Sequence, residues 1–372
     1  MVDICRATDY SATIISTDSL RKSRNHYDSC GRALRSPDGY GMLAPMRAVL
    51  IPHPGGPEVL RLSDVPDPEF GPEEVRVRVG ATALNRADLL QRRGRYPAPR
   101  GAPPDIPGLE FAGEVEARGR RAHRWQVGDR VMGILGGGGY AERVVLHEGL
   151  CMQVPPAMRW EEAAAIPEAF LTAFDALYEL GHLAGGETLL VHAAASGVGT
   201  AAVQLALAGG CHVIGFSRSA DKRERLLRLG VHQVLDPTVA DVAEAVREAS
   251  TGHGIDLVLD MVGAGVVDLN QEVLREQGRI VLIGLLGGAR AEFDLTRFIG
   301  KRLTLTGSVL RPRPLEQKLE LVRRFAPRVL PLFDSGSVRP VIDRSYSWTD
   351  VAEAHARMER NANFGKIVLR ID

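Results

Sequence analysis

A strand, a turn of small residues and a helix start follow one another in Leu189-Leu-Val-His-Ala-Ala-Ala-Ser-Gly-Val-Gly-Thr200. A nucleotide pyrophosphate binds where backbone N–H groups at a helix N-terminus are open to close approach. Ala194 and Gly197 leave that approach open, and Gly199 lets the helix pack closely against the strand. Ser196 adds a hydroxyl. The alternative is a tight turn without a ligand, but we expect the turn to hold cofactor phosphates through Ala194, Ser196, Gly197, Val198 and Gly199.

Strand and helix patterns alternate throughout the region around this turn. The strand segments are nearly continuous apolar runs, which is typical of strands covered by helices on both faces. Strands are predicted at Thr188–Ala193, His212–Ser217, Asp256–Asp260, Arg279–Gly284 and Leu303–Ser308. Helices are predicted at Gly199–Ala208, Asp221–Leu229, Val239–Ser250 and Val266–Glu276. The pattern predicts a doubly wound parallel sheet.

The end of the second predicted strand indicates which nucleotide binds. An NAD site would place an acidic residue there to hold the ribose 2′-hydroxyl, yet none occurs before Asp221. Ser217, Arg218 and Lys222 instead offer a hydroxyl and two cations to a 2′-phosphate. A solvated basic helix start is the alternative, but the pattern favours NADPH.

Two further strand ends carry small residues, which typically line the ligand-binding crevice of such sheets. They are Val262-Gly263 and the loop Gly284-Leu-Leu-Gly-Gly288. We expect Val262, Gly284 and Leu285 to lie beside the nicotinamide.

The preceding region, from Met46 to about Pro156, is rich in strand patterns. Val75-Arg-Val-Arg-Val79 alternates apolar and charged residues, as a strand with one wet face does. Short strand patterns with glycine punctuation suggest a small barrel. A last strand, Lys366–Ile371, is expected to pack back on this barrel. The predicted divisions are a disordered extension over 1–45, a substrate domain over 46–165 and 313–372, and a nucleotide-binding domain over 166–312.

Composition excludes several classes of protein. The 372 residues hold 46 Lys plus Arg and 46 Asp plus Glu, and this zero net charge disfavours a nucleic-acid partner. No apolar run is long enough for a membrane span. The four cysteines are far apart, which excludes a disulfide scaffold and fits a reducing, cytoplasmic setting. A mitochondrial presequence is a weaker alternative, because the first 45 residues carry five acids.

The chain from Met46 to Asp372 resembles the medium-chain dehydrogenase/reductase superfamily, and within it the zinc-free quinone oxidoreductase, or zeta-crystallin-like, branch. The resemblance implies an α/β fold with a GroES-like β-barrel domain and a doubly wound Rossmann domain. Its motifs are Pro54-Gly-Gly-Pro-Glu58, Ala83-Leu-Asn-Arg-Ala-Asp88, Pro107-Gly-Leu-Glu110, Gly128-Asp-Arg-Val131, the turn at 193–199 and Asn363-Phe-Gly-Lys366. Further branch motifs are Gln91–Tyr96, Ala165–Phe174 and Ser308–Arg311.

The resemblance also implies roles for single residues. Asn85 would lie near the nicotinamide ribose, and Tyr96 at the mouth of the quinone pocket. Thr172 would contact the nicotinamide. Asn361 and Lys366 would close the cofactor cleft, and Ser308 belongs to a cofactor-side motif. The expected catalytic residues are Tyr96, Asn85 and Ser196. One departure is Asp236-Pro237, where many relatives carry a Tyr near the 2′-phosphate.

Zinc alcohol dehydrogenases hold a Cys at the position of Asn85 and a His at that of Leu109. Their third ligand position aligns with Glu168. One potential ligand of three cannot hold a catalytic zinc, so no metal is expected. Without a Lewis acid, the acceptor must take a hydride readily by itself, and quinones and conjugated enones do so.

We therefore expect an NADPH-dependent quinone reductase acting on a small-molecule quinone. Two alternatives stay open: a zinc-free reductase of alkenals or enoyl thioesters, and a nucleotide-binding protein with little catalysis. The resemblance further implies a homodimer that pairs through about Leu303–Val309, whose alternating pattern would otherwise leave an open sheet edge.

Overall fold

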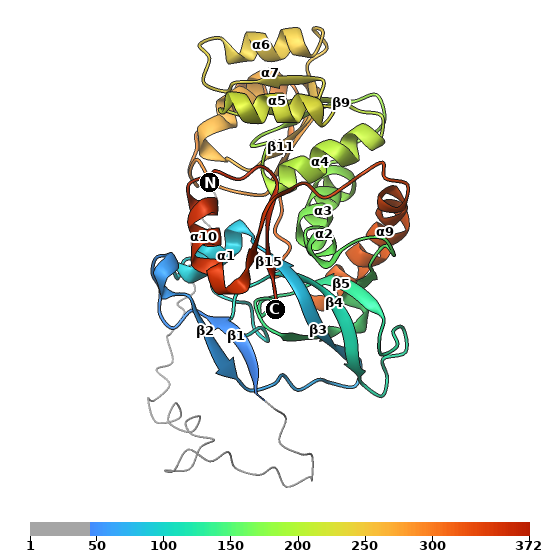
Figure 1. Cartoon of the computed structure of the whole chain (residues 1–372). Coiled ribbons are helices and arrows are strands. Elements are labelled where there is room, and N and C mark those ends of the chain that lie inside the picture. Colours follow the sequence, from blue (N-terminus) through green and yellow to red (C-terminus); the bar gives the residue numbers. More distant parts are fainter. Residues whose placement is uncertain (1–44) are drawn as a thin grey trace, which may run out of the picture. The chain divides into compact units, whose positions relative to one another are not determined.

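The computed structural model describes residues 45–372 of the chain, shown as coloured ribbon in Figure 1. The extension predicted over residues 1–45 lies outside the described residues, except for residue 45. No helix of the described part is long and apolar enough to cross a membrane.

A seven-stranded sheet contains the barrel strands and the last two strands of the chain. Its order is β14-β15-β3-β4-β5-β7, and β6 also pairs with β3, while β1 and β2 form a separate antiparallel pair. The bounds are β1 (Met46–Leu50), β2 (Arg61–Val65), β3 (Glu74–Ala83), β4 (Glu110–Arg118), β5 (Arg130–Ile134), β6 (Arg143–His147), β7 (Cys151–Gln153), β14 (Ile342–Ser347) and β15 (Lys366–Arg370).

Strand β3 is as the alternating sequence predicts. Val75, Val77 and Val79 are buried in the core, whereas Arg76 and Arg78 lie on the other face. The final strand β15 pairs antiparallel with β3, with Leu369 opposite Thr82. The end of the chain is therefore hydrogen-bonded to a strand formed near its beginning.

A second sheet of six parallel strands has the order β10-β9-β8-β11-β12-β13. The order reverses between β8 and β11, and ligands of open α/β sheets bind at such a switch point. The bounds are β8 (Thr188–Val191), β9 (His212–Phe216), β10 (Gln233–Leu235), β11 (Ile255–Asp260), β12 (Leu274–Leu282) and β13 (Thr304–Gly307).

Helices connect these strands and flank both sheets. They are α1 (Arg86–Arg92), α2 (Trp160–Ala164), α3 (Pro167–Phe174), α4 (Gly197–Ala208), α5 (Ala220–Arg228), α6 (Val242–Ala249), α7 (Val267–Val273), α8 (Leu295–Gly300), α9 (Leu315–Asp334) and α10 (Val351–Glu359). A single π-helical turn, Asp175–Leu180, continues α3.

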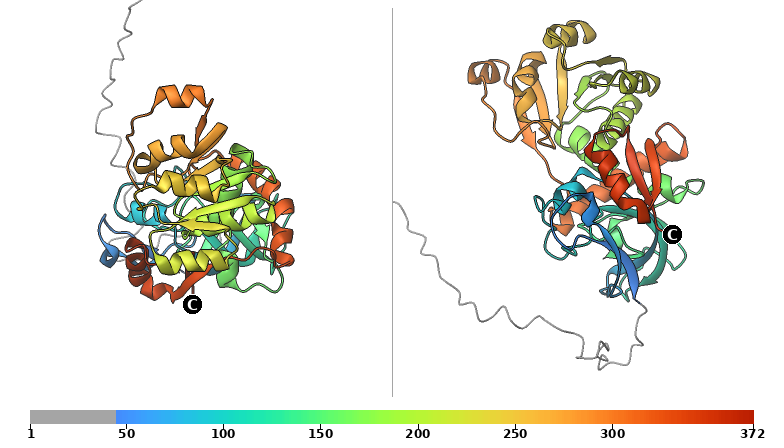
Figure 2. Two further views of the ribbon diagram at one scale, coloured as in Figure 1. Left: turned by 90° about the horizontal axis from the view of Figure 1, so that it is seen from above. Right: turned by 60° about the vertical axis from the view of Figure 1, so that its left-hand side comes forward.

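The parallel sheet is covered on both faces. Leu189 and Val191 of β8 pack into the same core as α4, whereas Leu190 between them packs into a separate core with Val246 of α6. Successive strand residues point to opposite faces, so two cores mean two helical layers. Figure 2 shows helices on either side of this sheet. The predicted doubly wound sheet is confirmed.

Two details of the prediction are wrong. Strand β10 was not expected, because its three residues are too few to give an apolar run. The helix predicted at Val266–Glu276 ends at Val273, and Glu276 belongs to β12. The reason is that Leu274 is drawn into the sheet, where it lies opposite Ile255 of β11 and is buried.

Candidate active site

The turn after β8 has the geometry that the sequence predicts. Ser196 caps α4, and its Oγ accepts a hydrogen bond of 3.0 Å from the Gly199 N–H. A Cβ at Gly199 would lie 2.6 Å from the carbonyl oxygens of Ala193 and Ala194, so only glycine fits there. A Cβ at Gly197 would instead lie 2.6 Å from the Cδ of the Lys366 side chain. The first turn of a twelve-residue helix is thus open to a phosphate at the switch point of the sheet.

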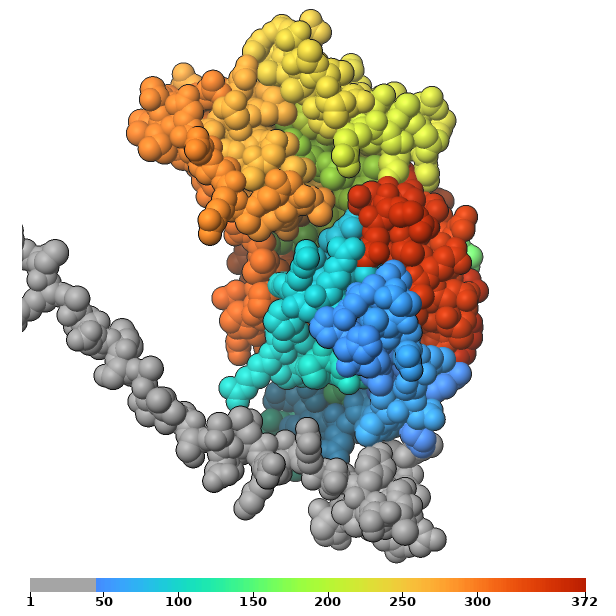
Figure 3. Space-filling model, turned by 90° about the vertical axis from the view of Figure 1, so that its left-hand side faces the viewer, coloured from blue at the N-terminus to red at the C-terminus, as the bar shows by residue number. Residues whose placement is uncertain are grey.

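A C-terminal segment, residues 361–366, lies against this turn. The Gly365 N–H donates to the Ala195 carbonyl at 2.9 Å, and a β-bridge joins Gly365 to Ser196. The Asn361 Oδ1 accepts a bond of 2.6 Å from Arg86 at the start of α1. In Figure 3 the red C-terminal region borders both the cyan α1 region and the parallel-sheet region above it. The segment therefore joins the barrel to the phosphate turn.

The residues predicted for the 2′-phosphate have different surroundings. Lys222 Nζ donates to the carbonyl oxygens of Asn361 and Asn363, at 2.6 and 2.7 Å. Ser217 is buried at the end of β9. Arg218 is exposed, and within residues 45–372 its guanidinium makes no hydrogen bond. Arg218 is therefore the cation of this group that is free to meet a ligand.

The carboxylate of Asp236, the acidic residue that follows β10, is hydrogen-bonded to other groups of the protein. Asp236 accepts a 2.8 Å bond from Arg223, and its other oxygen accepts bonds from the N–H and hydroxyl of Thr238. These hydrogen bonds from Thr238, followed by Arg223, lower the pKa of Asp236. Its carboxylate is thus engaged by the protein itself.

The loop after β11 is fixed by a buried polar chain that sequence reasoning missed. Asp260 accepts bonds from the N–H groups of Val262 and Gly263, at 2.7 and 2.9 Å, and from the Asn270 amide at 2.9 Å. His192 Nε2 lies 2.7 Å from the Asn270 Oδ1. Burial lowers the pKa of His192, so the neutral ring donates to Asn270. The sequence signal that could have indicated this chain is Asp260, an acidic residue at the end of an otherwise apolar strand.

The loop after β12 contacts the loop after β11 at Met261. A Cβ at Gly284 would lie 3.0 Å from the Met261 carbonyl oxygen, and Leu286 N donates to that oxygen at 3.2 Å. Leu285 is exposed. Val262, Gly284 and Leu285 are thus brought together at the carboxyl ends of β11 and β12.

Ser308, at the end of β13, contacts protein groups. Its hydroxyl donates to Asp175 at 3.0 Å, and Arg313 binds both oxygens of Asp175 at 2.9 and 2.6 Å. This bidentate pair ties the chain leaving β13 to the end of α3.

A hydrogen-bonded cluster joins the half-buried Asn85 to the buried side chains of Glu110 and Lys366. Lys366 Nζ donates to Glu110 Oε1 at 2.6 Å, to Asn85 Oδ1 at 2.8 Å and to the Leu84 carbonyl at 2.8 Å. Asn85 Nδ2 also donates to Glu110 at 2.8 Å. Three chain regions, α1, β4 and β15, therefore meet here. Sequence reasoning identified Asn85 and Lys366 but gave Glu110 no role.

Tyr96 lies beside Arg311, whose guanidinium carbon is 5.1 Å from the centre of the tyrosine ring. Arg311 is nearly fully buried and is held by the Gly136 carbonyl at 2.8 Å and by Gln91 Oε1 at 2.6 Å. Burial raises the pKa of Tyr96, so its hydroxyl stays protonated. The side chain is half-buried, and its ring is supported on one side by a fixed cation.

Helix α3 begins beside Glu110 of the Asn85–Glu110–Lys366 cluster and carries two polar residues. Glu168 and Thr172 are partly exposed, whereas the other six residues of the helix are buried. They are four positions apart, so they lie on one face. The Glu168 N–H donates to Glu110 Oε2 at 2.8 Å, and the charges of Glu110 and Lys366 both act on the Glu168 carboxyl. Desolvation of the carboxyl, and after it the charge of the Glu110 carboxylate, raise the pKa of Glu168 to about 8.

The residues at this position do not fit zinc. Within residues 45–372, no three His, Cys, Asp or Glu side chains lie together as a metal site needs. Asn85 is held by Lys366 and Glu110, and Leu109 offers no ligand atom. An ammonium group at the centre of the cluster also opposes a divalent cation.

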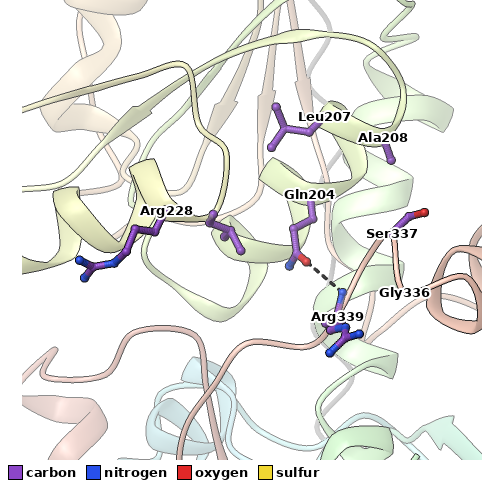
Figure 4. Close-up of a pocket in the computed structure, with 8 residues that line it drawn as sticks. Gln204, Leu207, Ala208, Arg228, Gly336, Ser337 and Arg339 are labelled. Atoms are coloured by element: carbon purple, nitrogen blue, oxygen red, sulfur yellow. Dashed lines mark hydrogen bonds between the residues drawn. The ribbon is translucent and has the colours of Figure 1, made fainter. Parts of the chain in front are cut away.

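A cavity of about 450 Å³ lies elsewhere on the molecule. Gln204 in the last turns of α4 lines it, and its Oε1 accepts a 2.9 Å bond from the Arg339 N–H (Figure 4). Because Ser196 caps the opposite end of α4, this cavity is not the phosphate site.

Comparisons with known proteins agree with this geometry. Residues 71–156 match the alcohol dehydrogenase GroES-like domain, and residues 197–325 match the zinc-binding dehydrogenase family. The quinone oxidoreductase of Pseudomonas aeruginosa is 35% identical over 85% of this chain and 96% of its own length. The synaptic vesicle membrane protein VAT-1 homolog of Rattus norvegicus is 32% identical, over 87% of this chain and 84% of its own.

Solved structures give the same result. A mycobacterial protein complexed with NADPH is 31% identical with a TM-score of 0.79, covering 88% of this chain and 100% of its own. The CurK enoyl reductase is 26% identical with a TM-score of 0.78, covering 88% and 99%.

These relatives support oxidoreductase activity and the use of a nicotinamide nucleotide. The predicted fold class, a GroES-like domain with a Rossmann-type parallel sheet, is confirmed. On the strength of both matched domains and of relatives that span most of the chain, the protein belongs to the medium-chain dehydrogenase/reductase family.

Proposed function

We propose that the protein is an NADPH-dependent quinone reductase. The observation that carries the proposal is the hydrogen-bonded cluster of Asn85, Glu110 and Lys366, whose amide and ammonium groups do not suit a Lewis-acid metal. The acceptor must then be a molecule that takes a hydride without one. A quinone qualifies because its reduced oxygen shares charge with an aromatic ring.

NADPH, when bound, supplies the hydride. The phosphate turn from Ala194 to Gly199, with Val198 among its residues, would bind the pyrophosphate. Ser217 and the cation Arg218 would bind the 2′-phosphate, and the carboxylate of Asp236 is already bonded to Arg223 and Thr238. The mycobacterial relative complexed with NADPH supports this cofactor.

Protein residues would position the acceptor. Thr172 lies on the partly exposed face of α3 and is expected to contact the nicotinamide, whereas the Tyr96 ring offers a stacking face for a flat acceptor. Arg311 holds that ring in place. Orienting two reactants in this way is a large part of catalysis when the acceptor is already reactive.

The test is loss of nicotinamide absorbance when the protein is mixed with NADPH and either a benzoquinone or a naphthoquinone. NADPH should be consumed far faster than NADH. Absence of turnover with a series of quinones would refute the proposal.

Enoyl reduction is the second candidate, favoured by the similarity to the CurK enoyl reductase. The same hydride could reach the β-carbon of a conjugated thioester. Comparison of kcat/KM for crotonyl thioester with that for a quinone decides between the two.

We further propose a homodimer that pairs through β13. This strand lies at the edge of the parallel sheet, and Leu305 and Val309 are exposed there, as is Ile299 of α8. A cytoplasmic setting is also proposed, because Cys151 and Cys211 are unpaired thiols.

A further inference from the structure

We propose that Glu168 is a catalytic acid, the group that gives a proton to the acceptor oxygen when the hydride arrives. The inference rests on the proposed reduction of a quinone or an enone. Three observations carry it: where the carboxyl lies on its helix, which partners it lacks and which charges surround it.

The first observation is position. Glu168 and Thr172 form the half-exposed face of α3, and Thr172 is the residue expected to contact the nicotinamide. A spacing of four residues places the two side chains one helical turn apart. An acceptor stacked on the nicotinamide would therefore lie within reach of the Glu168 carboxyl.

The second observation is the absence of a partner. Within residues 45–372 the Glu168 carboxyl makes neither a hydrogen bond nor an ion pair, although its backbone N–H bonds Glu110. Lys366 cannot serve, because an ammonium has three protons and Lys366 gives them to Glu110, Asn85 and Leu84. The carboxyl is thus free to donate a hydrogen bond to a ligand.

The third observation is charge. Glu168 faces two other acids, Glu110 of β4 and Asp88 of α1, and the cations around it are already committed to other acceptors. Lys318 of α9 donates to the Arg311 carbonyl at 2.7 Å, and Arg311 is bound by Gln91 and Gly136. The titratable groups that face Glu168 are Asp88, Tyr96, Glu110, Arg311, Lys318 and Lys366.

These surroundings keep the proton on Glu168 at neutral pH. Desolvation is the largest cause of its raised pKa, and the Glu110 carboxylate is the second. A neutral carboxylic acid with a pKa of about 8 is matched to donation near physiological pH. A glutamic acid with its ordinary pKa would have lost its proton at neutral pH and could not donate one.

Hydride and proton together reduce the acceptor. The acceptor gains two electrons and a proton as hydride, so its conjugated oxygen becomes an anion. The O–H bond of Glu168 breaks as that oxygen takes the proton, which leaves hydroquinone, or the enol of a reduced enone. The Glu168 carboxylate then regains a proton from water, and NADP⁺ departs.

The experiment compares the full-length protein with Glu168→Gln, which keeps the shape and neutrality of the protonated acid but cannot give up a proton. Steady-state rates with a quinone and with an enone are measured between about pH 6 and pH 10. For the wild type, kcat/KM should fall about tenfold per pH unit above pH 8, because the proton is lost there. Glu168→Gln should be slower by a factor of about 10² to 10⁴ and lose this limb of the profile.

Two further variants protect the test against a folding artefact. Glu168→Asp keeps an acid at the site and should retain the alkaline limb with an intermediate rate. Glu161→Gln, the same change on the neighbouring helix α2, should leave rate and profile unchanged. NADPH binding, followed by nicotinamide fluorescence, should agree within about twofold for all proteins.

The failures are distinguishable. A wild-type protein that reduces no quinone or enone overturns the proposed function and the role of Glu168 with it. An active wild type with an equally active Glu168→Gln of unchanged pH profile overturns the role of Glu168 alone. An infrared difference spectrum at pH 7 that lacks a protonated carboxyl band assigned to Glu168 would also overturn it.

Discussion

Lys366 of the last strand donates a 2.6 Å hydrogen bond to Glu110 of β4, and both side chains are buried. The pair is a charged contact inside a core formed by residues far apart in the sequence. Removing one partner of such a pair leaves an uncompensated charge out of water, whereas removing both does not.

Lys366→Met should therefore lower the free energy of unfolding by about 3–5 kcal/mol. The remaining Glu110 carboxylate would keep only its neutral donors, the Asn85 amide and the Glu168 N–H. Urea denaturation followed by circular dichroism measures the change. The double variant Lys366→Met with Glu110→Gln should recover part of the loss. A single variant as stable as the wild type would contradict this account of the cluster.

Gly199→Ala should abolish nucleotide binding. The added Cβ would meet two carbonyl oxygens at 2.6 Å, so the turn must open and the first N–H groups of α4 would move. The measurement is NADPH fluorescence titration. Gly300→Ala is the matched control, since a Cβ there has nothing within 4 Å and binding should be unchanged. Equal affinities for the two variants would place the phosphates elsewhere.

Arg218→Ala should reduce affinity for NADPH by a factor of about 10 to 100, corresponding to one charge-assisted hydrogen bond. Affinity for NADH should not change, because NADH lacks the 2′-phosphate. Isothermal titration with both nucleotides measures the two effects. Arg228→Ala, which removes a different exposed arginine at the end of α5, serves as control. Parallel losses for NADPH and NADH would show that Arg218 does not read the 2′-phosphate.

Leu305→Lys should convert the proposed dimer to a monomer. Leu305 lies on the edge strand β13 and is 40% exposed, so the new ammonium would be buried at the interface. Light scattering coupled to gel filtration gives the mass of each form. Leu227→Lys changes an exposed leucine of α5 in the same way and should leave the mass unchanged. A monomeric wild type would refute the dimer.

The inner strands of the parallel sheet were predictable because burial on both faces forces continuous apolar runs. The phosphate turn was predictable too, since only small residues permit the turn at Gly199. Strand β10 was not predicted, because its three residues at the edge of the sheet form too short an apolar run to be recognised. The end of α7 was misplaced since Leu274 suits a helix face and a strand equally.

The polar part of the site was harder to predict. Glu110 and Lys366 are 256 positions apart, and no local pattern states that their side chains meet. Asp260, Asn270 and His192 form their chain by the same kind of long-range contact. Lys222 was expected at a phosphate but binds two backbone carbonyls, because the C-terminal segment comes within its reach. Such partners follow from tertiary packing rather than from local sequence.

The pairing of β15 with β3 has a consequence for biosynthesis. Lys366 meets Asn85 across 281 positions of chain, and the whole parallel sheet is encoded between them. Closing so long a loop is slow, whereas neighbouring strand–helix units can associate as they emerge. The parallel sheet is therefore expected to fold before the barrel is completed, because the barrel also requires β15 at the end of the chain. Catalytic competence would then be the last property that a newly made molecule acquires.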